Sequence, residues 1–281
     1  MTTPTSDFVS TDLGRWHVRR SGTGDPPVVL WHSLFVDSRS WGPVADAVAQ
    51  TRTVYAVDGP AHGRSAGVGR RFTFAEVADG AAQLLDGLGC TAPVDWVGNA
   101  WGGHVGIQLA VRHPERTRTL ITIGTPVHAL TARERWTMVW PLVALYRVVG
   151  PNRMLLKALS EALIGAEYVA AQPDRSAEVL SAFSAADRAA MFGAMRSMML
   201  DRPGMAGDVT RVRQPALLLA GRDDPMGWQP SDAEVVAATM PHARAGGVAG
   251  SGHVTPLVVD ADAVLAAITD FWAGAGGPTG P

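Results

Sequence analysis

The stretch 95–106, DWVGNAWGGHVG, decides the fold that the sequence predicts. A valine-containing apolar run leads into a corner flanked by Gly98 and Gly102, and a helix-like segment follows. A sharp strand-to-helix turn with the pattern G-x-S-x-G has this form, and its serine is a nucleophile. Ala100 stands here in place of the serine. The sequence therefore predicts the turn without its reacting hydroxyl group.

Short apolar runs lie on both sides of this turn and alternate with helical patterns. The runs that we predict as strands are 15–20, 26–32, 52–58, 93–98, 119–124 and 215–221. Helical patterns occupy residues 72–88 and 101–113. Strands that alternate with helices of this size predict an α/β fold, with a mostly parallel sheet and helices on both faces.

The segment 126–208 breaks this alternation and carries helix signals only. Thr131 with Glu134 fits a capping box, and Ser184 with Asp187 fits a second one. Apolar residues at helical spacing follow the first box: Trp136, Val139, Trp140 and Val143. We expect a helical cap inserted at 126–208 into a core formed by 1–125 and 209–281.

The cap contains many methionines and two tryptophans, Trp136 and Trp140. Most of these side chains are expected to pack the cap onto the core. A few, with Trp136 and Trp140 as the candidates, are expected to line an apolar cavity and contact the substrate.

Composition narrows the functional classes. Lys and Arg number 24 against 26 Asp and Glu, a net charge of −2 without a basic run, which argues against nucleic acid as a partner. A single cysteine, Cys90, excludes an intrachain disulfide framework and a cysteine metal cage. Neither a secretory signal nor an apolar run of ~18 residues is evident, so we expect a cytoplasmic protein without a membrane partner. The oligomeric state is left open.

Four segments, taken in chain order, resemble the α/β-hydrolase superfamily. They are HSLFVDSRSW at 32–41, DGPAHGRS at 58–65, VGNAWGG at 97–103, and the pair LLLAGRDDP at 217–225 and GSGHVTPL at 250–257. The resemblance spans nearly the whole chain. It implies an α/β-hydrolase fold: a mostly parallel eight-stranded sheet flanked by helices, with a helical cap.

The resemblance also implies a catalytic triad in the chain order nucleophile, acid, histidine. Ala100, Asp224 and His253 stand at these three positions, and Asp223 is a second candidate for the acid. In such a triad the histidine takes the proton of the nucleophile, and the carboxylate fixes the imidazole and stabilises its cation. The alternative is that the aspartates are turn residues and that His253 is an ordinary loop residue.

An oxyanion hole needs two N–H donors directed at the developing negative charge. By the resemblance these are the backbone N–H groups of Leu34 and Trp101. His32 and Ser33 are expected near the substrate; Ser33 replaces the usual glycine, and its hydroxyl either reaches the pocket or bonds local backbone. The histidines show no metal-ligand spacing, so the site is predicted to need no metal and no cofactor.

Three explanations of Ala100 remain. The first is a serine-to-alanine replacement in an enzyme that hydrolyses an ester, a lactone or an activated C–C bond of a hydrophobic small molecule. The second is an enzyme that never needs a serine, in which His253 and Asp224 act as an acid–base pair for a lyase, isomerase or cyclase reaction. The third is a non-catalytic protein that binds a small molecule. The retained glycines of the corner argue against the third, because that backbone is costly to keep without a use.

Overall fold

The computed structural model describes residues 4–222, 224, 228–249, 253–254, 257 and 260–275. Within these residues, eight strands form one sheet in the order β1-β2-β4-β3-β5-β6-β7-β8. The strands are β1 (Thr5–Thr11), β2 (Gly14–Ser21), β3 (Val28–Trp31), β4 (Val54–Val57), β5 (Val94–Asn99), β6 (Thr117–Ile123), β7 (Ala216–Gly221) and β8 (Ala243–Val248). Pairs β1–β2 and β2–β4 are antiparallel, and the other neighbours are parallel. The mostly parallel eight-stranded sheet expected from the resemblance is confirmed.

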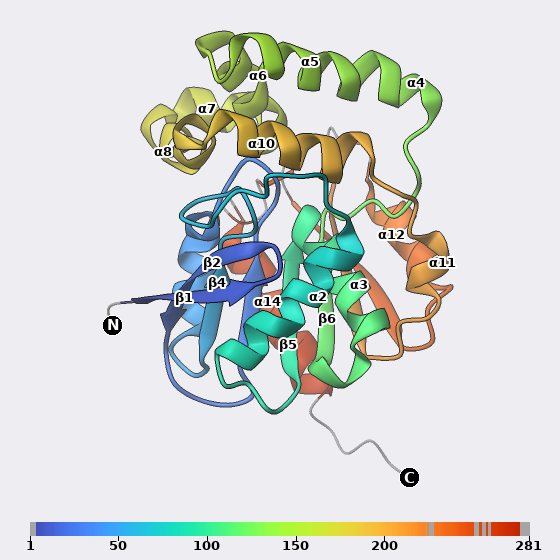
Figure 1. Ribbon diagram of the computed structural model, residues 1–281. Coiled ribbons are helices and arrows are strands. Elements are labelled where there is room, and N and C mark those ends of the chain that lie inside the picture. The colour runs from blue at the N-terminus through green and yellow to red at the C-terminus, as the bar shows by residue number, and fades with distance from the viewer. Residues whose placement is uncertain are drawn as a thin grey trace.

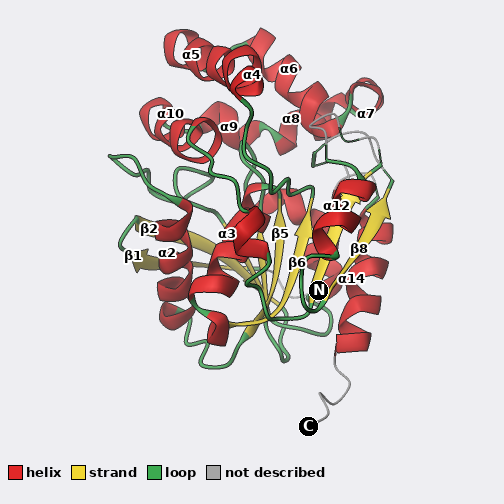
Figure 2. Cartoon of the chain, turned by 90° about the vertical axis from the view of Figure 1, so that its right-hand side faces the viewer, coloured by secondary structure: helices red, strands yellow, loops and turns green. Residues whose placement is uncertain are grey.

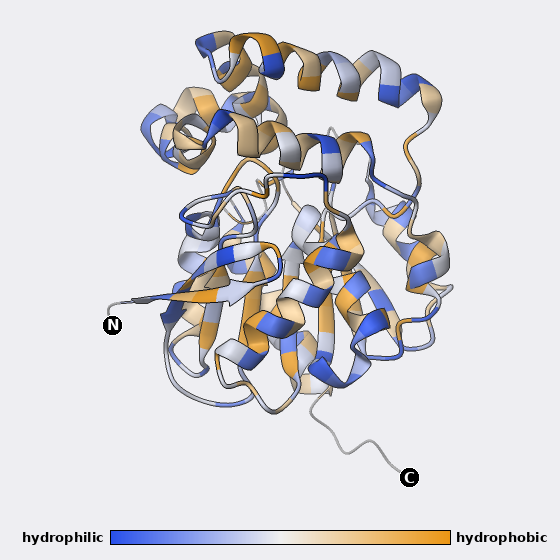
Figure 3. Cartoon of the chain, in the orientation of Figure 1, coloured by the Kyte–Doolittle hydropathy of each residue, from blue (hydrophilic) through white to orange (hydrophobic). Residues whose placement is uncertain are grey.

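Helices cover both faces of the sheet (Figures 1 and 2). One face packs against α2 (Phe74–Gly87), α3 (Trp101–Arg112) and α12 (Pro230–Ala237), and the other against α1 (Gly42–Val48) and α14 (Ala261–Ala275). The central strands are buried on both faces because successive side chains point to opposite sides. In β3, for example, Val29 and Trp31 enter one core, and Val28 and Leu30 the other. Colouring by hydropathy shows that the helices on the sheet carry both hydrophobic and hydrophilic residues (Figure 3).

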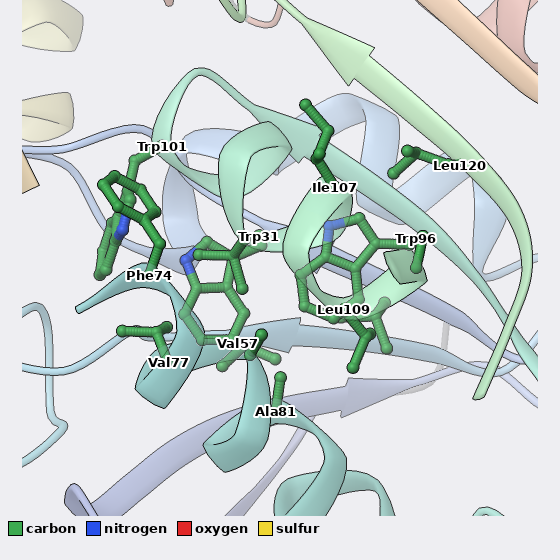
Figure 4. Close-up of a cluster of buried hydrophobic side chains, with 14 of the residues drawn as sticks. Trp31, Val57, Phe74, Val77, Ala81, Trp96, Trp101, Ile107, Leu109 and Leu120 are labelled. Atoms are coloured by element: carbon green, nitrogen blue, oxygen red, sulfur yellow. The ribbon is translucent and has the colours of Figure 1, made fainter. Parts of the chain in front are cut away.

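Tryptophans fill the core beneath the strand-to-helix corner (Figure 4). The Trp31 ring stacks on Trp96, with centroids 5.5 Å apart, and meets Trp101 edge-on at 5.7 Å. The indole Nε1 of Trp96 donates to the carbonyl of Gly102 at 2.9 Å. This packing fixes the first turn of α3 against the sheet.

Helices between β6 and β7 form a separate layer above the carboxyl ends of the parallel strands (Figures 1 and 2). We call this the helical layer; it runs from Ala132 to Leu200. Its segments are α4 (Ala132–Glu134), η3 (Arg135–Val139), α5 (Trp140–Val149), α6 (Arg153–Ile164), α7 (Ala166–Ala171), α8 (Pro173–Val179), α9 (Ser181–Ala185), α10 (Arg188–Met195) and η4 (Arg196–Leu200). A further short helix, α11 (Ala206–Val209), precedes β7.

The two predicted capping boxes have different outcomes. Thr131 and Glu134 cap α4 reciprocally, as expected. The prediction for Ser184 is wrong: Ser184 lies inside α9, and Asp187 itself is the N-cap of α10, accepting from the backbone N–H of Ala190. Among the helices in the described part of the chain, none has both the length and the hydrophobicity of a membrane span.

Candidate functional site

Ala100 occupies the corner between β5 and α3, with φ 49° and ψ −103°. This backbone conformation is strained for a residue that carries a Cβ. The flanking glycines are required by close packing. A Cβ on Gly98 would lie 2.1 Å from the carbonyl carbon of Gly102, and one on Gly102 would lie 2.1 Å from the carbonyl oxygen of Trp31. The corner therefore has the form of a nucleophile elbow and presents a methyl group.

His253 and Asp224 are brought together from the loops that follow β8 and β7. The distance from His253 Nδ1 to Asp224 Oδ2 is 2.8 Å, and both side chains are buried. Because a carboxylate only accepts, Nδ1–H donates to Asp224, and Nε2 is left as the basic nitrogen. The second candidate acid, Asp223, lies outside the described residues.

Two residues that the sequence analysis missed lie next to this pair, Asn99 and Gly124. Asn99 Nδ2 donates to the carbonyl oxygens of Ile123 and His253, both at 3.1 Å. Gly124, with φ 60°, lies so close that an added Cβ would be 3.4 Å from His253 Nδ1 and 3.5 Å from Asp224 Oδ2. The signal for both was their position at the end of a strand next to the elbow.

The expected oxyanion donors lie beside Ala100. Leu34 and Trp101 both line the cavity that Ala100 and His253 line. Among the described residues, neither backbone N–H has a hydrogen-bond acceptor. The next residue, Phe35, has φ 73° and donates its N–H to His62 Nε2 at 3.2 Å. Leu34 and Trp101 are therefore the N–H groups that remain free to bind a ligand oxygen.

His32 and Ser33 are placed differently from each other. Ser33 lines the cavity, whereas His32 is fully buried and does not. His32 Nδ1 donates to the carbonyl of Ser33 at 2.6 Å, and Nε2 accepts from the N–H of Gly59 at 2.9 Å. The prediction that His32 contacts the substrate is corrected: it braces the loop that carries Leu34.

A second set of buried groups supports the same loop. Asp58 accepts from His17 Nδ1 at 2.8 Å and from the backbone N–H groups of Ser38 and Arg64. Burial acts to raise the pKa of Asp58, but these hydrogen bonds outweigh it and hold the pKa below its usual value. Burial lowers the pKa of His62 to about 3, which keeps its Nε2 free to accept from Phe35.

The cavity above Ala100 has a volume of about 260 Å³ and is mainly apolar. The helical layer supplies its apolar wall: Met138, Val139, Leu142, Leu159, Leu163 and Met198. A small polar group completes it: His104, His128, Glu134 and Arg202. This polar group was not found from the sequence, because its members are far apart in the chain.

Trp136 and Trp140 lie on the outer side of the helical layer, which corrects their expected placement. Their exposed fractions are 64% and 48%, and neither lines the cavity. The two residues are four apart and so share one face of the helix, while Val139 and Leu142 face inward. Spacing alone predicted the helix but not which face is buried.

No group of three or more His, Cys, Asp or Glu side chains that could hold a metal ion occurs in the described part of the chain. The cavity combines two N–H donors, a histidine–aspartate pair, a methyl group, an apolar wall and a small polar group.

Comparison with known proteins shows which family this chain matches and which proteins it is similar to. The family model described as "Alpha/beta hydrolase family" matches residues 28–268. A pimeloyl-[acyl-carrier protein] methyl ester esterase of Salmonella heidelberg is 31% identical over 120 residues. That match covers 43% of this chain and 44% of the esterase, so it spans less than half of either protein.

Solved structures share the fold over nearly the full length. A thermophilic esterase from Thermogutta terrifontis superposes with a TM-score of 0.85 at 21% identity, covering 96% of this chain and 99% of that one. The enol-lactonase from Burkholderia xenovorans LB400 also gives 0.85, at 22% identity, with coverage of 95% and 100%.

Proposed function

Because this chain belongs to the alpha/beta hydrolase family, we propose that its cavity binds an ester or lactone of a hydrophobic small molecule and activates it for hydrolysis. The observation that carries the proposal is the His253–Asp224 hydrogen bond of 2.8 Å at the cavity that Ala100 also lines. The substrate carbonyl oxygen is bound by the N–H groups of Leu34 and Trp101. The esterases and the lactonase among the similar proteins support this substrate class.

Ala100 determines which route is open. With a hydroxyl at this position, His253 Nε2 takes its proton and the oxygen adds to the carbonyl. The ester C–O bond then breaks, His253 returns the proton to the leaving alcohol oxygen, and an acyl-enzyme forms. A methyl group has no proton to give and no lone pair, so this chain forms no acyl-enzyme. Water must attack directly, with His253 as base and Asp224 stabilising the imidazolium. By analogy with proteases that lack a triad residue, we expect a residual acceleration of ~10³–10⁴-fold over water.

Substituting Ala100→Ser tests the proposal. The serine variant is expected to hydrolyse p-nitrophenyl esters and to be labelled by a fluorophosphonate probe, whereas the Ala100 protein is not labelled. The double variant Ala100→Ser/His253→Ala should lose both properties, because the serine then has no base. A serine variant that folds normally but is inert in both assays would disprove the acyl-enzyme chemistry.

The intact acid–base pair beside a methyl group favours one alternative function. Here His253 moves a proton on the substrate itself in a lyase, isomerase or cyclase reaction, and no serine is needed. Under this alternative the Ala100 protein turns over its substrate fully, His253→Ala abolishes turnover, and Ala100→Ser gains no esterase activity. A non-catalytic binding protein would instead release its ligand chemically unchanged, which mass spectrometry of the recovered ligand detects.

A further inference from the structure

Arg202 is a buried cation in the wall of the cavity. It follows the helical layer and is only 8% exposed. One of its donors, Nη1, binds the carbonyl of Pro126 at 2.7 Å. Within the described residues Nε and Nη2 have no acceptor, and no carboxylate forms an ion pair with the guanidinium. Arg202 is also the single arginine or lysine among the residues described as lining the cavity.

A buried, unpaired guanidinium is unfavourable. Moving a charge out of water costs several kcal/mol unless it is paired and hydrogen-bonded. Burial lowers the pKa of Arg202 from its usual value, but a guanidinium stays protonated in proteins. The positive charge is therefore present in the cavity and has hydrogen-bonding capacity that the protein does not use.

Among the polar groups of the cavity wall, only Glu134 carries a charge that offsets the guanidinium, and it does so in part. Burial lowers the pKa of His104 to about 3, so its ring is neutral at pH 7. Glu134 lies on the same cavity and interacts electrostatically with Arg202 without forming an ion pair. One oxygen of Glu134 is held by the N–H and hydroxyl of Thr131, in the capping box of α4.

We propose that Arg202 binds a carboxylate of the substrate, so that the site takes esters or lactones whose apolar carbon chain ends in a carboxylate group. The planar guanidinium offers Nε and Nη2 as a parallel pair of donors, which matches the two oxygens of a carboxylate. The apolar wall formed by Leu142, Leu159 and Met198 accommodates the chain between the two ends. This inference rests on the proposed function, because it names the substrate class of the same site.

Binding to the Ala100 protein tests the proposal without an activity measurement, because turnover through an acyl-enzyme is closed to this protein. Calorimetry is used to compare monoethyl esters of linear dicarboxylic acids, from succinate to suberate, each with the neutral ethyl ester in which a methyl group replaces the carboxylate. At least one monoethyl ester is expected to bind more tightly than its neutral partner. Arg202→Met should remove that preference, an effect of about 10- to 100-fold, as for a hydrogen bond to a charged group.

Three further variants separate recognition from a structural role. Arg202→Lys should restore part of the preference, because it keeps the charge but loses the paired donors. Glu134→Gln should increase it, since a repelling carboxylate is removed while glutamine still serves the capping box. Arg133→Met is the matched control, an exposed arginine of the helical layer outside the cavity wall, and should change nothing.

Two results would overturn the inference: equal affinity for charged and neutral esters along the whole series, or a loss in Arg202→Met that is the same for both. The second result would mean that Arg202 has only a structural role, through its hydrogen bond to the carbonyl of Pro126. The proposed function is tested by a separate experiment, and it fails if Ala100→Ser does not hydrolyse p-nitrophenyl esters. If Ala100→Ser is inert but the preference for charged esters depends on Arg202, the proposed hydrolysis is wrong and the carboxylate site is supported. If Ala100→Ser is active but the preference is absent, the hydrolysis is supported and the carboxylate site is wrong.

Discussion

The side-chain amide of Asn99 joins the elbow to the histidine loop: Asn99 Nδ2 donates to the carbonyl oxygen of His253 at 3.1 Å. Asn99 directly precedes Ala100 in the chain. Its side-chain amide therefore links the elbow, on one side of the site, to the backbone of the loop that carries His253 on the other. The next residue of that loop is tied to the helical layer, because the N–H of Val254 donates to the carbonyl of Leu163 at 2.7 Å. His253 is therefore positioned from below by the sheet and from above by α6.

Asn99→Ala should separate the histidine from the elbow. It removes the donor to His253 and the donor to Ile123, each worth about 1 kcal/mol. In the Ala100→Ser background we expect kcat/KM for p-nitrophenyl esters to fall about tenfold, mostly through kcat. The control is Asn152→Ala, which removes the N-cap of α6 and its bond to the N–H of Leu155. That control should lower the free energy of unfolding by about 1 kcal/mol and leave kcat unchanged; equal kcat losses in both variants would contradict a positioning role for Asn99.

Ala100→Gly should stabilise the protein. The backbone of Ala100, at φ 49° and ψ −103°, is strained with a Cβ and relaxed without one. After subtracting the extra chain entropy of glycine in the unfolded state, we expect the free energy of unfolding to rise by about 1 kcal/mol, measured by urea denaturation.

The matched control for this prediction is Ala266→Gly, at an exposed position inside α14. Glycine in a helix interior lowers stability by about 1 kcal/mol, so the two substitutions should have opposite signs. If both destabilise, the corner is not under strain.

Gly102→Ala should damage the fold itself. The added Cβ would lie 2.1 Å from the carbonyl oxygen of Trp31, a backbone atom that cannot rotate away. We expect a loss of about 3 kcal/mol or more in the free energy of unfolding, or failure to fold, detected by circular dichroism and urea denaturation. Gly69→Ala is the control, since nothing lies within 4 Å of the Cβ it would carry; its stability should change by no more than about 0.5 kcal/mol.

The sequence predicted what short-range chemistry determines. The glycines of the corner allow strand and helix to cross closely, and the apolar runs on either side predict buried parallel strands. The chain order of Ala100, Asp224 and His253 then indicated which loops meet. Each of these inferences needs only neighbouring residues or the known order of a family.

What escaped prediction depends on packing between distant elements. Helical spacing identifies the face shared by Trp136 and Trp140, but only the position of α5 above the sheet decides that this face points outward. Arg202 gave no local signal either, because its place in the cavity follows from the path of the chain after the helical layer.

The wall of the cavity supplies a test of that correction. Leu142→Ala removes apolar surface that lines the cavity, whereas Trp140→Ala removes surface that is 48% exposed and outside the cavity. Because Leu142→Ala weakens apolar packing against the ligand by about 1 kcal/mol, we expect KM of the Ala100→Ser enzyme for a hydrophobic p-nitrophenyl ester to rise about fivefold. Trp140→Ala should leave KM within about twofold of the parent, since its side chain does not touch the ligand. A larger rise in KM for Trp140→Ala would mean that Trp140 does contact the substrate, as the sequence predicted.

Acid should destabilise the protein through its buried histidines. Burial lowers the pKa of His32, of His62 to about 3 and of His104 to about 3, from an unfolded value near 6.5. As pH falls below about 6.5, the unfolded chain binds protons at these rings while the folded protein does not. Unfolding is thus coupled to proton uptake, and the free energy of unfolding decreases from about pH 6.5 towards pH 3. Above that window the stabilisation is fully present.

His104→Gln isolates one of these protons. His104 Nε2 donates to the carbonyl of Pro126 at 2.8 Å, and the glutamine amide offers a donor in a similar position without a titrating ring. Urea denaturation at intervals between pH 7 and pH 4 gives the proton uptake from the slope of stability against pH. We expect the variant to take up about one proton fewer than the parent over this range, because one of the histidines that stay neutral in the folded state is gone. An unchanged slope would mean that His104 is protonated in the folded protein, and the polar end of the cavity would then carry a second positive charge beside Arg202.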